Sequence, residues 1–357
     1  MRPFRDMSLS ALLDTFATSS AQTAEYAGAP AVRIFSNVET ELSVLLRSAG
    51  VSALTWRSKL VLTGDDRQRW LNGMVTNNTR DLAIGHGNYS FLLNAQGRIQ
   101  TDLTAWNRGE FYVAETDASQ VTAIKEFFER YIIMDDVEVE DVSEKLAALG
   151  LIGPESRLVL ERAGLLLPEL ATGAIADLHW NGIGCSVARM PEDRFESFEI
   201  WCAPENAKAL WDGIVAAGAA PVGSDALEAH RILIGIPRIG IDIRDRELPQ
   251  ETAQLHALHH SKGCYIGQEI VERIHSRGAV HRQLTGFEFD GPPAPTGSKV
   301  MVGDKELGEV TSNVTVSFEG RTRNIALGYL HREHAVPGNE VVAGGKTARV
   351  SALPFRL

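Results

Sequence analysis

The chain has 357 residues, of which 44% are hydrophobic, 23% charged and 7% aromatic. These are globular proportions, which exclude a disordered or collagen-like chain, and the length exceeds what one hydrophobic core usually organises. The 46 acidic residues outnumber the 35 basic ones, and the net charge of −11 argues against a general nucleic-acid-binding protein, because neutralising phosphates requires a basic surface.

The first 145 residues mix helices and strands without a regular alternation. Ser8 is a candidate cap for a short amphipathic helix in an N-terminal extension at 1–30. The segments that follow predict, in order, a helix at 38–49, a strand at 59–63, a helix at 67–75, strands at 89–93 and 99–106 around a turn at 94–97, a strand at 111–114, a helix at 118–131 and a strand at 137–142. This order favours an α+β fold over a doubly wound sheet.

The rest of the chain divides into a second mixed region and a region of short strands. The second region predicts strands at 146–152, 185–189 and 197–201 and helices at 204–217 and 224–233. The proline-rich run 291–297 is interpreted as a boundary, and the Val-rich segments with Gly turns beyond it predict a small β-barrel. We therefore expect α+β domains at 31–145 and 146–280, with interleaving of the two left open, and a C-terminal β-barrel at 281–357.

The cysteines and the hydropathy indicate an intracellular environment. Cys185, Cys202 and Cys264 are widely spaced, which fits neither a disulfide framework nor a cysteine-rich zinc site. No segment reaches the length of a membrane span, and the N-terminus does not resemble a signal peptide, so a cytoplasmic protein is expected. On a helix, His256 and His260 would share a face as in some zinc sites, but solvated histidines are the favoured interpretation.

The segment 262–269, with the sequence KGCYIGQE, carries the strongest indication of chemistry. Its two glycines suit a loop wrapped closely around a ligand, with Lys262 and Tyr265 as candidate ligand contacts. Cys264 is a candidate reactive thiol, because nearby cations such as Arg273 make a thiolate more available. The equally weighted alternative is a buried structural cysteine at the start of a helix.

Two further residues are candidates for ligand contact. Asp102 lies a few residues beyond the turn at 94–97, where its carboxylate could accept a hydrogen bond from a ligand amine. Its default interpretation is a solvated strand end. Arg231, which precedes Asp242, could bind a carboxylate through two hydrogen bonds, but its default interpretation is a surface ion pair.

The octapeptide KGCYIGQE resembles the signature of the YgfZ-type folate-binding proteins, which belong to the superfamily of the glycine-cleavage T-protein, an aminomethyltransferase. Other stretches similar to that family follow in the expected order, at 63–65, 70–77, 94–103, 131–142, 153–154, 231–242 and 248–251. The resemblance covers residues 30–357. It implies a three-domain cloverleaf ring around a central channel that holds tetrahydrofolate, with the predicted barrel as the C-terminal domain.

The resemblance also assigns expected roles to residues. Asp102 falls where T-proteins carry two adjacent aspartates, one of which meets the folate amine, but here the preceding residue is Thr101. Arg231 matches an arginine near the pterin, although the glutamate that follows it in T-proteins is Leu233 here. Glu196 and Glu199 match a stretch that supplies possible pterin acceptors. In the resembled family, Cys264 of the octapeptide is the residue linked to function.

These departures favour a tetrahydrofolate-binding accessory protein for iron–sulfur cluster assembly or repair. Its partners would be folate and iron–sulfur enzymes or assembly proteins, and its support of tRNA modification would be indirect, without nucleic-acid or membrane binding. The alternative is a folate-dependent aminomethyltransferase of the glycine cleavage system, in which Asp102 alone positions the folate nitrogen. A third hypothesis is a non-catalytic interaction module, so whether the protein is an enzyme stays open.

Overall fold

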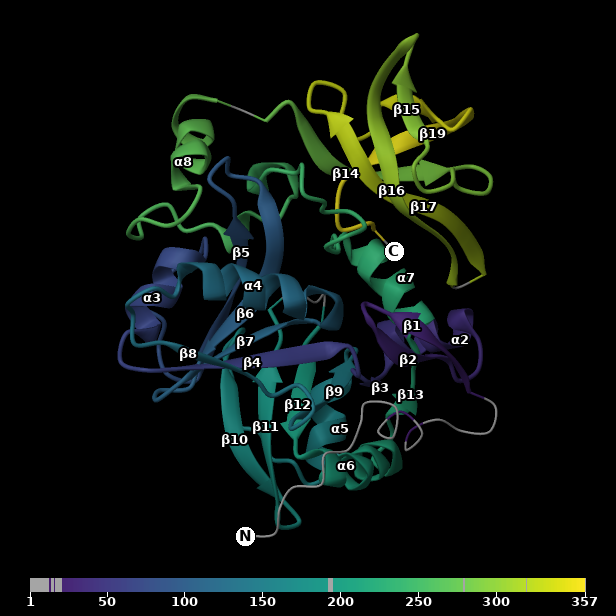
Figure 1. The fold of residues 1–357 in the computed structure, drawn as a ribbon. Helices are drawn as coiled ribbons and strands as arrows, with labels where there is room; N and C mark the ends of the chain where they lie inside the picture. The colour runs from purple at the N-terminus through teal and green to yellow at the C-terminus, as the bar shows by residue number, and fades with distance from the viewer. Residues whose placement is uncertain are drawn as a thin grey trace. The chain divides into compact units, whose positions relative to one another are not determined.

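The computed structural model describes Leu13, Phe16 and residues 21–191, 195–278, 280–318 and 320–356, so the predicted cap Ser8 lies outside the described residues. The chain forms two compact units whose segments alternate along the sequence, and Figure 1 labels their helices and strands. Unit 1 comprises Met1–Leu71, Thr79–Tyr89 and Leu103–Leu227, and unit 2 comprises Asn72–Asn78, Ser90–Asp102 and Glu228–Leu357.

Unit 1 contains a two-stranded sheet and a six-stranded sheet. The two-stranded sheet pairs β1 (Gln22–Tyr26) with β2 (Ala29–Ile34), and the six-stranded sheet has the order β10-β11-β12-β9-β3-β13. The bounds of these six strands are β3 Gly50–Ala53, β9 Ala147–Ile152, β10 Ile175–Trp180, β11 Ile183–Arg189, β12 Phe198–Cys202 and β13 Ala220–Pro221. The helices that begin in this unit are α2 Val38–Arg47, α3 Arg67–Met74, α4 Val121–Tyr131, α5 Ser156–Arg162, α6 Pro204–Ala216 and α7 Ser224–Ile234, and η1 Ala118–Gln120 is a 3-10 turn.

One hydrophobic core holds the six-stranded sheet to its helices. Leu149 and Leu151 from β9, Ile200 from β12 and Ile214 from α6 are all fully buried in it. The apolar face of α6 therefore supplies the cover for one face of this sheet, as expected for an amphipathic helix on a sheet.

A five-stranded antiparallel sheet has the order β5-β6-β7-β4-β8. Its bounds are β4 Arg57–Thr63, β5 His86–Leu93, β6 Ile99–Asn107, β7 Tyr112–Asp117 and β8 Glu138–Asp141. Strands β5 and β6 each continue along the chain from one unit into the other. Within unit 1, α4 buries Ile124 and Phe128, and the Phe128 ring meets the Trp70 ring edge-on at 5.1 Å between centroids.

Unit 2 contains a closed six-stranded barrel with the order β14-β17-β16-β15-β18-β19. It is closed by pairing of β14 with β19, and Phe287, Val310 and Leu330 lie in its core. The bounds are β14 Arg282–Phe289, β15 Lys299–Val302, β16 Lys305–Phe318, β17 Arg321–His331, β18 Glu340–Ala343 and β19 Lys346–Ser351. The other elements of unit 2 are α8 Gln268–Arg277 and the 3-10 turns η2 Pro249–Glu251 and η3 Leu255–Ala257.

The structure confirms the predicted α+β fold and the C-terminal barrel. The proline-rich run 291–297 connects β14 to β15 inside the barrel, so its interpretation as a domain boundary was wrong. The division into three domains and the ring around a channel stay predictions. Among the described residues, no helix is both long enough and apolar enough to span a membrane.

Candidate functional site

Lys262 of the octapeptide ties two segments of unit 2 together. Its ammonium group donates hydrogen bonds of 2.6 Å to the backbone carbonyls of Asn72, Val75 and Asn77. These carbonyls lie at and beyond the C-terminal end of α3, where a helix leaves acceptors without partners. The side chain is buried, and Nζ lies 5.0 Å from the centroid of the Tyr265 ring. All three N–H groups of Lys262 are therefore used within the protein.

The second glycine of the octapeptide packs against the predicted hairpin turn. Gly267 has a φ of +81°, and a Cβ at this position would lie 2.6 Å from the carbonyl oxygen of Asn94. Gly97, at the other end of the turn, has a φ of +71°, and a Cβ there would lie 2.7 Å from Cβ of Ile270 in α8. Glycine is required at both positions by conformation and by close approach. The structure thus brings the octapeptide and the 94–97 turn into direct contact.

Cys264 and Tyr265 differ sharply in their surroundings. The Cys264 side chain is exposed in an irregular segment four residues before α8 begins. This excludes the alternative of a buried structural cysteine at a helix start. Tyr265 is buried, and burial together with the nearby carboxylate of Glu272 raises the pKa of its hydroxyl above the usual range. Cys264 is therefore the accessible group of the pair.

Asp102 lies in β6, at the end of the middle segment of unit 2. Alternate residues of this strand differ in burial: Ile99 and Thr101 are buried, whereas Gln100 is exposed and Asp102 is half-buried. Because side chains alternate across a strand, Asp102 shares the more open face with Gln100. A half-buried carboxylate on such a face can meet a ligand amine.

Arg231, on α7, is the centre of a polar cluster in unit 2. Nε and Nη2 donate to the Glu228 carboxylate at 2.8 and 2.6 Å, and Nη1 donates at 2.8 Å to the buried Asp242 carboxylate and to the carbonyl of Ile236. Nη2 also donates to the Ser312 hydroxyl of β16 at 2.9 Å. These five bonds use all five N–H donors of the guanidinium group. A ligand carboxylate would have to displace one of these partners.

Glu196 forms an ion-pair cluster near the surface of unit 1. Its carboxylate accepts hydrogen bonds from Nε and Nη2 of Arg157 at 2.8 and 3.0 Å and lies 3.2 Å from Arg189. The hydrogen bond from Arg157 lowers the pKa of the Glu196 carboxyl. Glu196 is therefore a charged acceptor whose geometry is fixed by two arginines.

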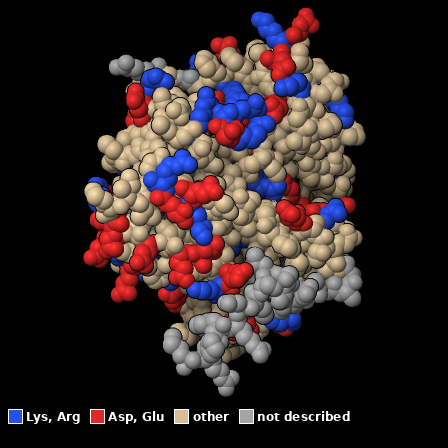
Figure 2. All heavy atoms as spheres, in the orientation of Figure 1, with Lys and Arg blue, Asp and Glu red and all other residues tan. Residues whose placement is uncertain are grey.

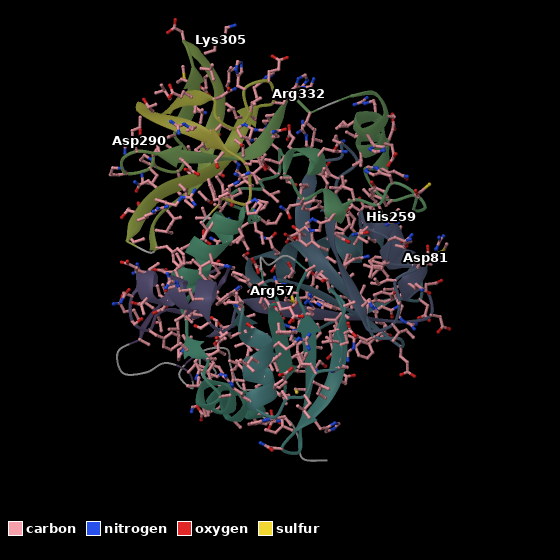
Figure 3. All side chains as sticks on the ribbon, turned by 180° about the vertical axis from the view of Figure 1, so that it is seen from behind. Arg57, Asp81, His259, Asp290, Lys305 and Arg332 are labelled. Carbon is pink, nitrogen blue, oxygen red and sulfur yellow. The ribbon has the colours of Figure 1, made fainter. Side chains whose placement is uncertain are left out.

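Glu199, on β12, belongs to a second and much more buried cluster of unit 1. The fully buried Glu115 of β7 lies 3.1 Å from the ammonium group of Lys59 and 3.5 Å from Arg57. Arg57, labelled in Figure 3, also lies 3.6 Å from Glu199. Glu199 accepts a hydrogen bond of 3.1 Å from the indole N–H of Trp201. Two cations and two carboxylates are thus enclosed among the strands of this unit.

The pKa values of the two carboxyl groups in this cluster are shifted in opposite directions. Burial, reinforced by the neighbouring Glu115, raises the pKa of Glu199. For Glu115 burial acts in the same direction, but Lys59 and Arg57 outweigh it and hold its pKa well below the usual range. The charge on Glu115 is itself one cause of the raised pKa of Glu199, so the two carboxyls titrate as a pair. Glu199 is the protonated partner at neutral pH and Glu115 the ionised one.

The sequence analysis identified Glu199 but not Lys59, Arg57 and Glu115. The sequence carries little signal for them, because β4 (RSKLVLT) and β7 (YVAETD) mix polar and apolar residues, so Lys59 and Glu115 do not stand out as buried charges. Buried charges occur only where they are paired. Asp242 was named together with Arg231 and does accept its hydrogen bond, whereas Glu228 was missed, although it stands three residues before Arg231 on the same helix, which is the spacing of a helical ion pair.

The histidines near the octapeptide do not share a helix face, contrary to the geometry considered for zinc. His256 lies in η3, whereas His260 follows that turn and its Nδ1 lies 3.0 Å from the Glu272 carboxylate. The His260 ring also stacks on His275 with 3.7 Å between centroids. In the part of the chain that the structure describes, no group of three or more His, Cys, Asp or Glu residues could hold a metal ion.

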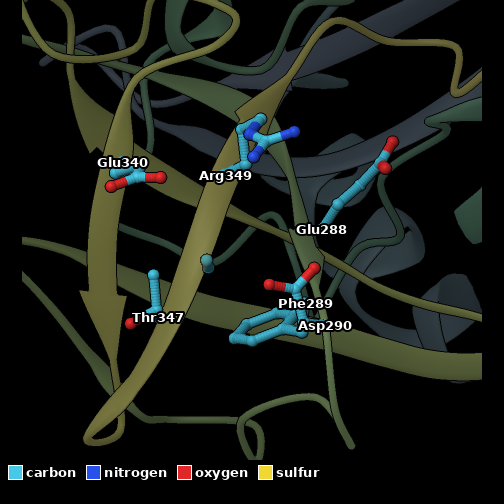
Figure 4. Close-up of a pocket in the computed structure, with 7 residues that line it drawn as sticks. Glu288, Phe289, Asp290, Glu340, Thr347 and Arg349 are labelled. Atoms are coloured by element: carbon cyan, nitrogen blue, oxygen red, sulfur yellow. The ribbon is translucent and has the colours of Figure 1, made fainter.

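A pocket on the barrel is separate from these candidates. Glu288, Asp290, Glu340 and Arg349 line it, together with Phe289, Thr347 and Ala348 (Figure 4). None of the residues that the sequence predicts for ligand binding lies among them. The pocket therefore offers no support for a folate site.

Comparison with known proteins gives the family. The domain family described as "GCVT N-terminal domain" matches residues 12–262, and "Glycine cleavage T-protein C-terminal barrel domain" matches residues 282–355. The chain belongs to the glycine cleavage T-protein family. The barrel match coincides with strands β14–β19, which agrees with the barrel of unit 2.

Relatives within the T-protein family match the chain over most of its length. An aminomethyltransferase of Rubrobacter xylanophilus is 29% identical and covers 94% of this chain and 90% of its own. A chloroplastic protein of Arabidopsis thaliana, named only as a transferase, is 27% identical over 96% of this chain and 79% of its own. The crystal structure of a glycine cleavage system aminomethyltransferase T from Bartonella henselae has a TM-score of 0.83 at 22% identity, covering 95% of each chain, and shows the same fold.

Proposed function

We propose that this protein binds tetrahydrofolate and transfers an aminomethyl-derived one-carbon unit to it. Membership of the T-protein family and the relatives named as aminomethyltransferases support this proposal. The observation that carries it is the half-buried carboxylate of Asp102 on the more open face of β6. The ring of three domains around a folate channel, in the ranges given above, belongs to the same proposal, whereas the YgfZ-type assignment belongs to the second candidate function below.

The proposed reaction moves the methylene carbon of a sulfur-bound aminomethyl group onto the amine nitrogens of tetrahydrofolate, and releases ammonia and the free thiol of the carrier. Asp102 would accept a hydrogen bond from a folate N–H and orient the lone pair of that nitrogen toward the methylene carbon. The same carboxylate would receive the proton that the nitrogen loses. Since Thr101 stands where T-proteins carry a second aspartate, Asp102 would perform both steps alone.

The other predicted contacts fit a folate to different degrees. The carboxylate of Glu196 could accept hydrogen bonds from the N–H donors of a pterin ring, whereas the buried carboxyl of Glu199 is already engaged by Trp201 and Arg57. Arg231 and Lys262 use all their N–H groups within unit 2, so they would support the fold around the ligand rather than supply spare donors. Tyr265 offers a buried ring for packing.

The direct test is formation of methylenetetrahydrofolate from a lipoyl-carried aminomethyl group. We expect the wild-type chain to form it and Asp102→Asn to lower kcat by about 10²-fold, the size typical of a lost acid–base group. Calorimetric titration should show that Asp102→Asn still binds tetrahydrofolate, with weakened affinity. A chain that binds no tetrahydrofolate at high micromolar concentration would refute the proposal.

The exposed thiol of Cys264 favours a second candidate function, a folate-binding accessory protein for iron–sulfur cluster assembly or repair in the cytoplasm. In that case the partners are iron–sulfur enzymes or assembly proteins, and any effect on tRNA modification passes through them. Cys264→Ala should then lower the activity of iron–sulfur enzymes in cells, while the variant still binds tetrahydrofolate. Under the transferase proposal, the same variant should retain one-carbon transfer and leave those enzymes unaffected.

A further inference from the structure

The loop between α4 and β8 in unit 1 presents two neighbouring apolar side chains to solvent. Ile133 is 81% exposed and Met134 is 94% exposed, the two highest values among the exposed large apolar residues described. The residues on either side, Phe128 in α4 and Val137 before β8, are buried. The chain therefore leaves the core after Phe128 and returns to it at Val137, nine residues later, with Ile133 and Met134 exposed between them.

This loop is held rigidly by hydrogen bonds to the start of α3. The indole N–H of the buried Trp70 donates to the carbonyl of Tyr131 at 3.2 Å. The N–H of Asp66 donates to the carbonyl of Asp136 at 3.1 Å, and the N–H of Asp136 donates back to the Asp66 carboxylate at 3.0 Å. Both ends of the loop are thus tied to one helix.

A close backbone approach fixes the same loop further. Gly64 has a φ of +95°, and a Cβ there would lie 2.1 Å from the carbonyl oxygen of Asp136. A loop held in this way loses little conformational entropy when a partner covers it, so its apolar surface contributes to binding without an ordering cost.

The surroundings of the apolar pair are acidic. Four carboxylates lie where the start of α3 meets the loop, and we call them the acidic collar: Asp65, Asp66, Asp135 and Asp136. Arg69 pairs with Asp66 at 2.9 Å and with Asp135 at 2.5 Å. The neighbouring Arg67 donates to the carbonyls of Gly64 and Gly109 and pairs with no carboxylate of the collar, whose four carboxylates outnumber the two arginines. Figure 2 shows acidic side chains gathered over the region of α3 and β8.

We propose that Ile133 and Met134, together with the acidic collar beside them, form a docking surface for a basic protein partner that holds the two side chains in an apolar pocket bordered by Lys and Arg. An apolar centre with a charged rim is the usual anatomy of a protein interface. A second copy of this chain is disfavoured by the net charge of −11 on each copy. An anionic lipid surface would be repelled by the collar.

The partner is to be trapped in cells with a photo-crosslinking amino acid at position 134 of the full-length chain, and with one at position 166 as control. Leu166 is a suitable control because it is 75% exposed and lies in unit 1 after α5. We expect one discrete protein, crosslinked only from position 134, whose isoelectric point is basic. An acidic protein, or equal crosslinking from both positions, would overturn the proposal.

The trapped protein is then purified and its affinity for the variants is measured by calorimetry. The double variant Ile133→Ser/Met134→Ser should weaken binding by about ten-fold or more, and Leu166→Ser should leave it unchanged. Asp65→Asn/Asp136→Asn should weaken binding less, and this difference should vanish at high salt. All four chains should unfold at similar temperatures, because the changed side chains are exposed.

Three other outcomes would also overturn the proposal. One is self-association of the wild-type chain in sedimentation that Ile133→Ser/Met134→Ser abolishes. Another is flotation of the wild-type chain with phosphatidylglycerol vesicles that the same variant loses. Unchanged affinity of the double variant for the trapped protein would have the same consequence.

Discussion

At the scale of single residues, the chain places titratable groups where their protons are controlled by neighbours. Glu199 and Glu115 are both buried, and Lys59 and Arg57 stabilise the charge on Glu115. The result is one ionised and one neutral carboxyl side by side. A carboxyl that stays protonated at neutral pH can donate as well as accept, which distinguishes Glu199 from the ionised Glu196.

The protonation of Glu199 predicts a pH-dependent stability. Its pKa rises from 4.5 in the unfolded chain to about 8 in the folded protein, so the folded state retains a proton that the unfolded state releases. Stability should therefore fall as the pH rises through this window, by up to about 1.4 kcal/mol per pH unit, and level off above pH 8. Glu199→Gln, which is neutral throughout, should remove the fall in thermal midpoints measured between pH 5 and 8.

Glu196→Gln is the matched control for this measurement. Arg157 lowers the pKa of Glu196, so Glu196 is ionised in both states above pH 5. Its difference from the wild type should not change between pH 5 and 8. A slope that persists unchanged in Glu199→Gln would show that other groups cause it, and would contradict the raised pKa assigned to Glu199.

Removing the ammonium group of Lys262 should lower the stability of the fold. Lys262→Met keeps the apolar stem of the side chain but leaves the carbonyls of Asn72, Val75 and Asn77 without their common donor. The loss of these charge-assisted bonds should cost about 3 kcal/mol of unfolding free energy. Urea titration measures this, with Lys305→Met as control, because the Lys305 side chain is exposed (Figure 3) and its replacement should change stability by less than about 0.5 kcal/mol. An equal effect of both variants would contradict the role assigned to Lys262.

At the scale of elements, the octapeptide works as a connector as well as a candidate binding segment. Its lysine satisfies the end of α3, its second glycine lets the start of α8 approach the hairpin turn, and Ile266 donates its N–H to the carbonyl of Gly73 at 3.3 Å. These contacts leave Cys264 exposed between two anchored points. The sequence motif is therefore explained in part by packing, and the thiol is the part that packing does not explain.

Replacing each of the two glycines of the octapeptide by alanine should have different effects on stability. Gly267→Ala places a Cβ at a φ of +81° and 2.6 Å from the Asn94 oxygen, so it should lower the unfolding free energy by about 2 kcal/mol or more. A Cβ on Gly263 would meet nothing within 4 Å, so Gly263→Ala should be neutral within about 0.5 kcal/mol. Chemical denaturation of the two variants makes the comparison, and similar losses in both would mean that the segment tolerates no side chain at either glycine.

Long amphipathic segments and several short strands could be predicted from the sequence, but short segments without a clear pattern could not. The 118–131 helix was expected because its apolar residues recur at helical spacing, and the structure places α4 at Val121–Tyr131. The strands β3 and β10 were missed. The four residues GVSA of β3 are all buried, so no alternation marks them as a strand. β10 contains polar Asp177 and His179, which interrupt its apolar pattern.

The residues of the candidate site could be predicted from the sequence, but their contacts could not, because these contacts depend on the fold. The contact between the octapeptide and the 94–97 turn joins segments far apart in sequence, and only the glycines indicated a close approach. The engagement of Arg231 by Glu228 and Asp242 depends on the fold, so the sequence left a ligand and an ion pair as alternatives. The exposure of Cys264 was likewise open until the structure excluded its burial.

At the scale of the whole molecule, the chain carries a spectroscopic label in one unit only. All six tryptophans lie in unit 1, at positions 56, 70, 106, 180, 201 and 211. Tryptophan fluorescence therefore reports the unfolding of unit 1. Hydrogen exchange in β17, which lies in the barrel, reports the opening of unit 2.

These two probes separate the effect of a ligand on each unit. A ligand bound by Asp102 stabilises unit 2, the unit to which Asp102 belongs. At a concentration 100 times its dissociation constant, tetrahydrofolate should stabilise that unit by about 2.7 kcal/mol and slow exchange through global opening in β17 by about a hundred-fold. Asp102→Asn should lose this protection at the same concentration, because its affinity is weaker. A ligand that raises only the tryptophan midpoint and leaves β17 unprotected would contradict Asp102 as its contact and point to the Glu199 cluster instead.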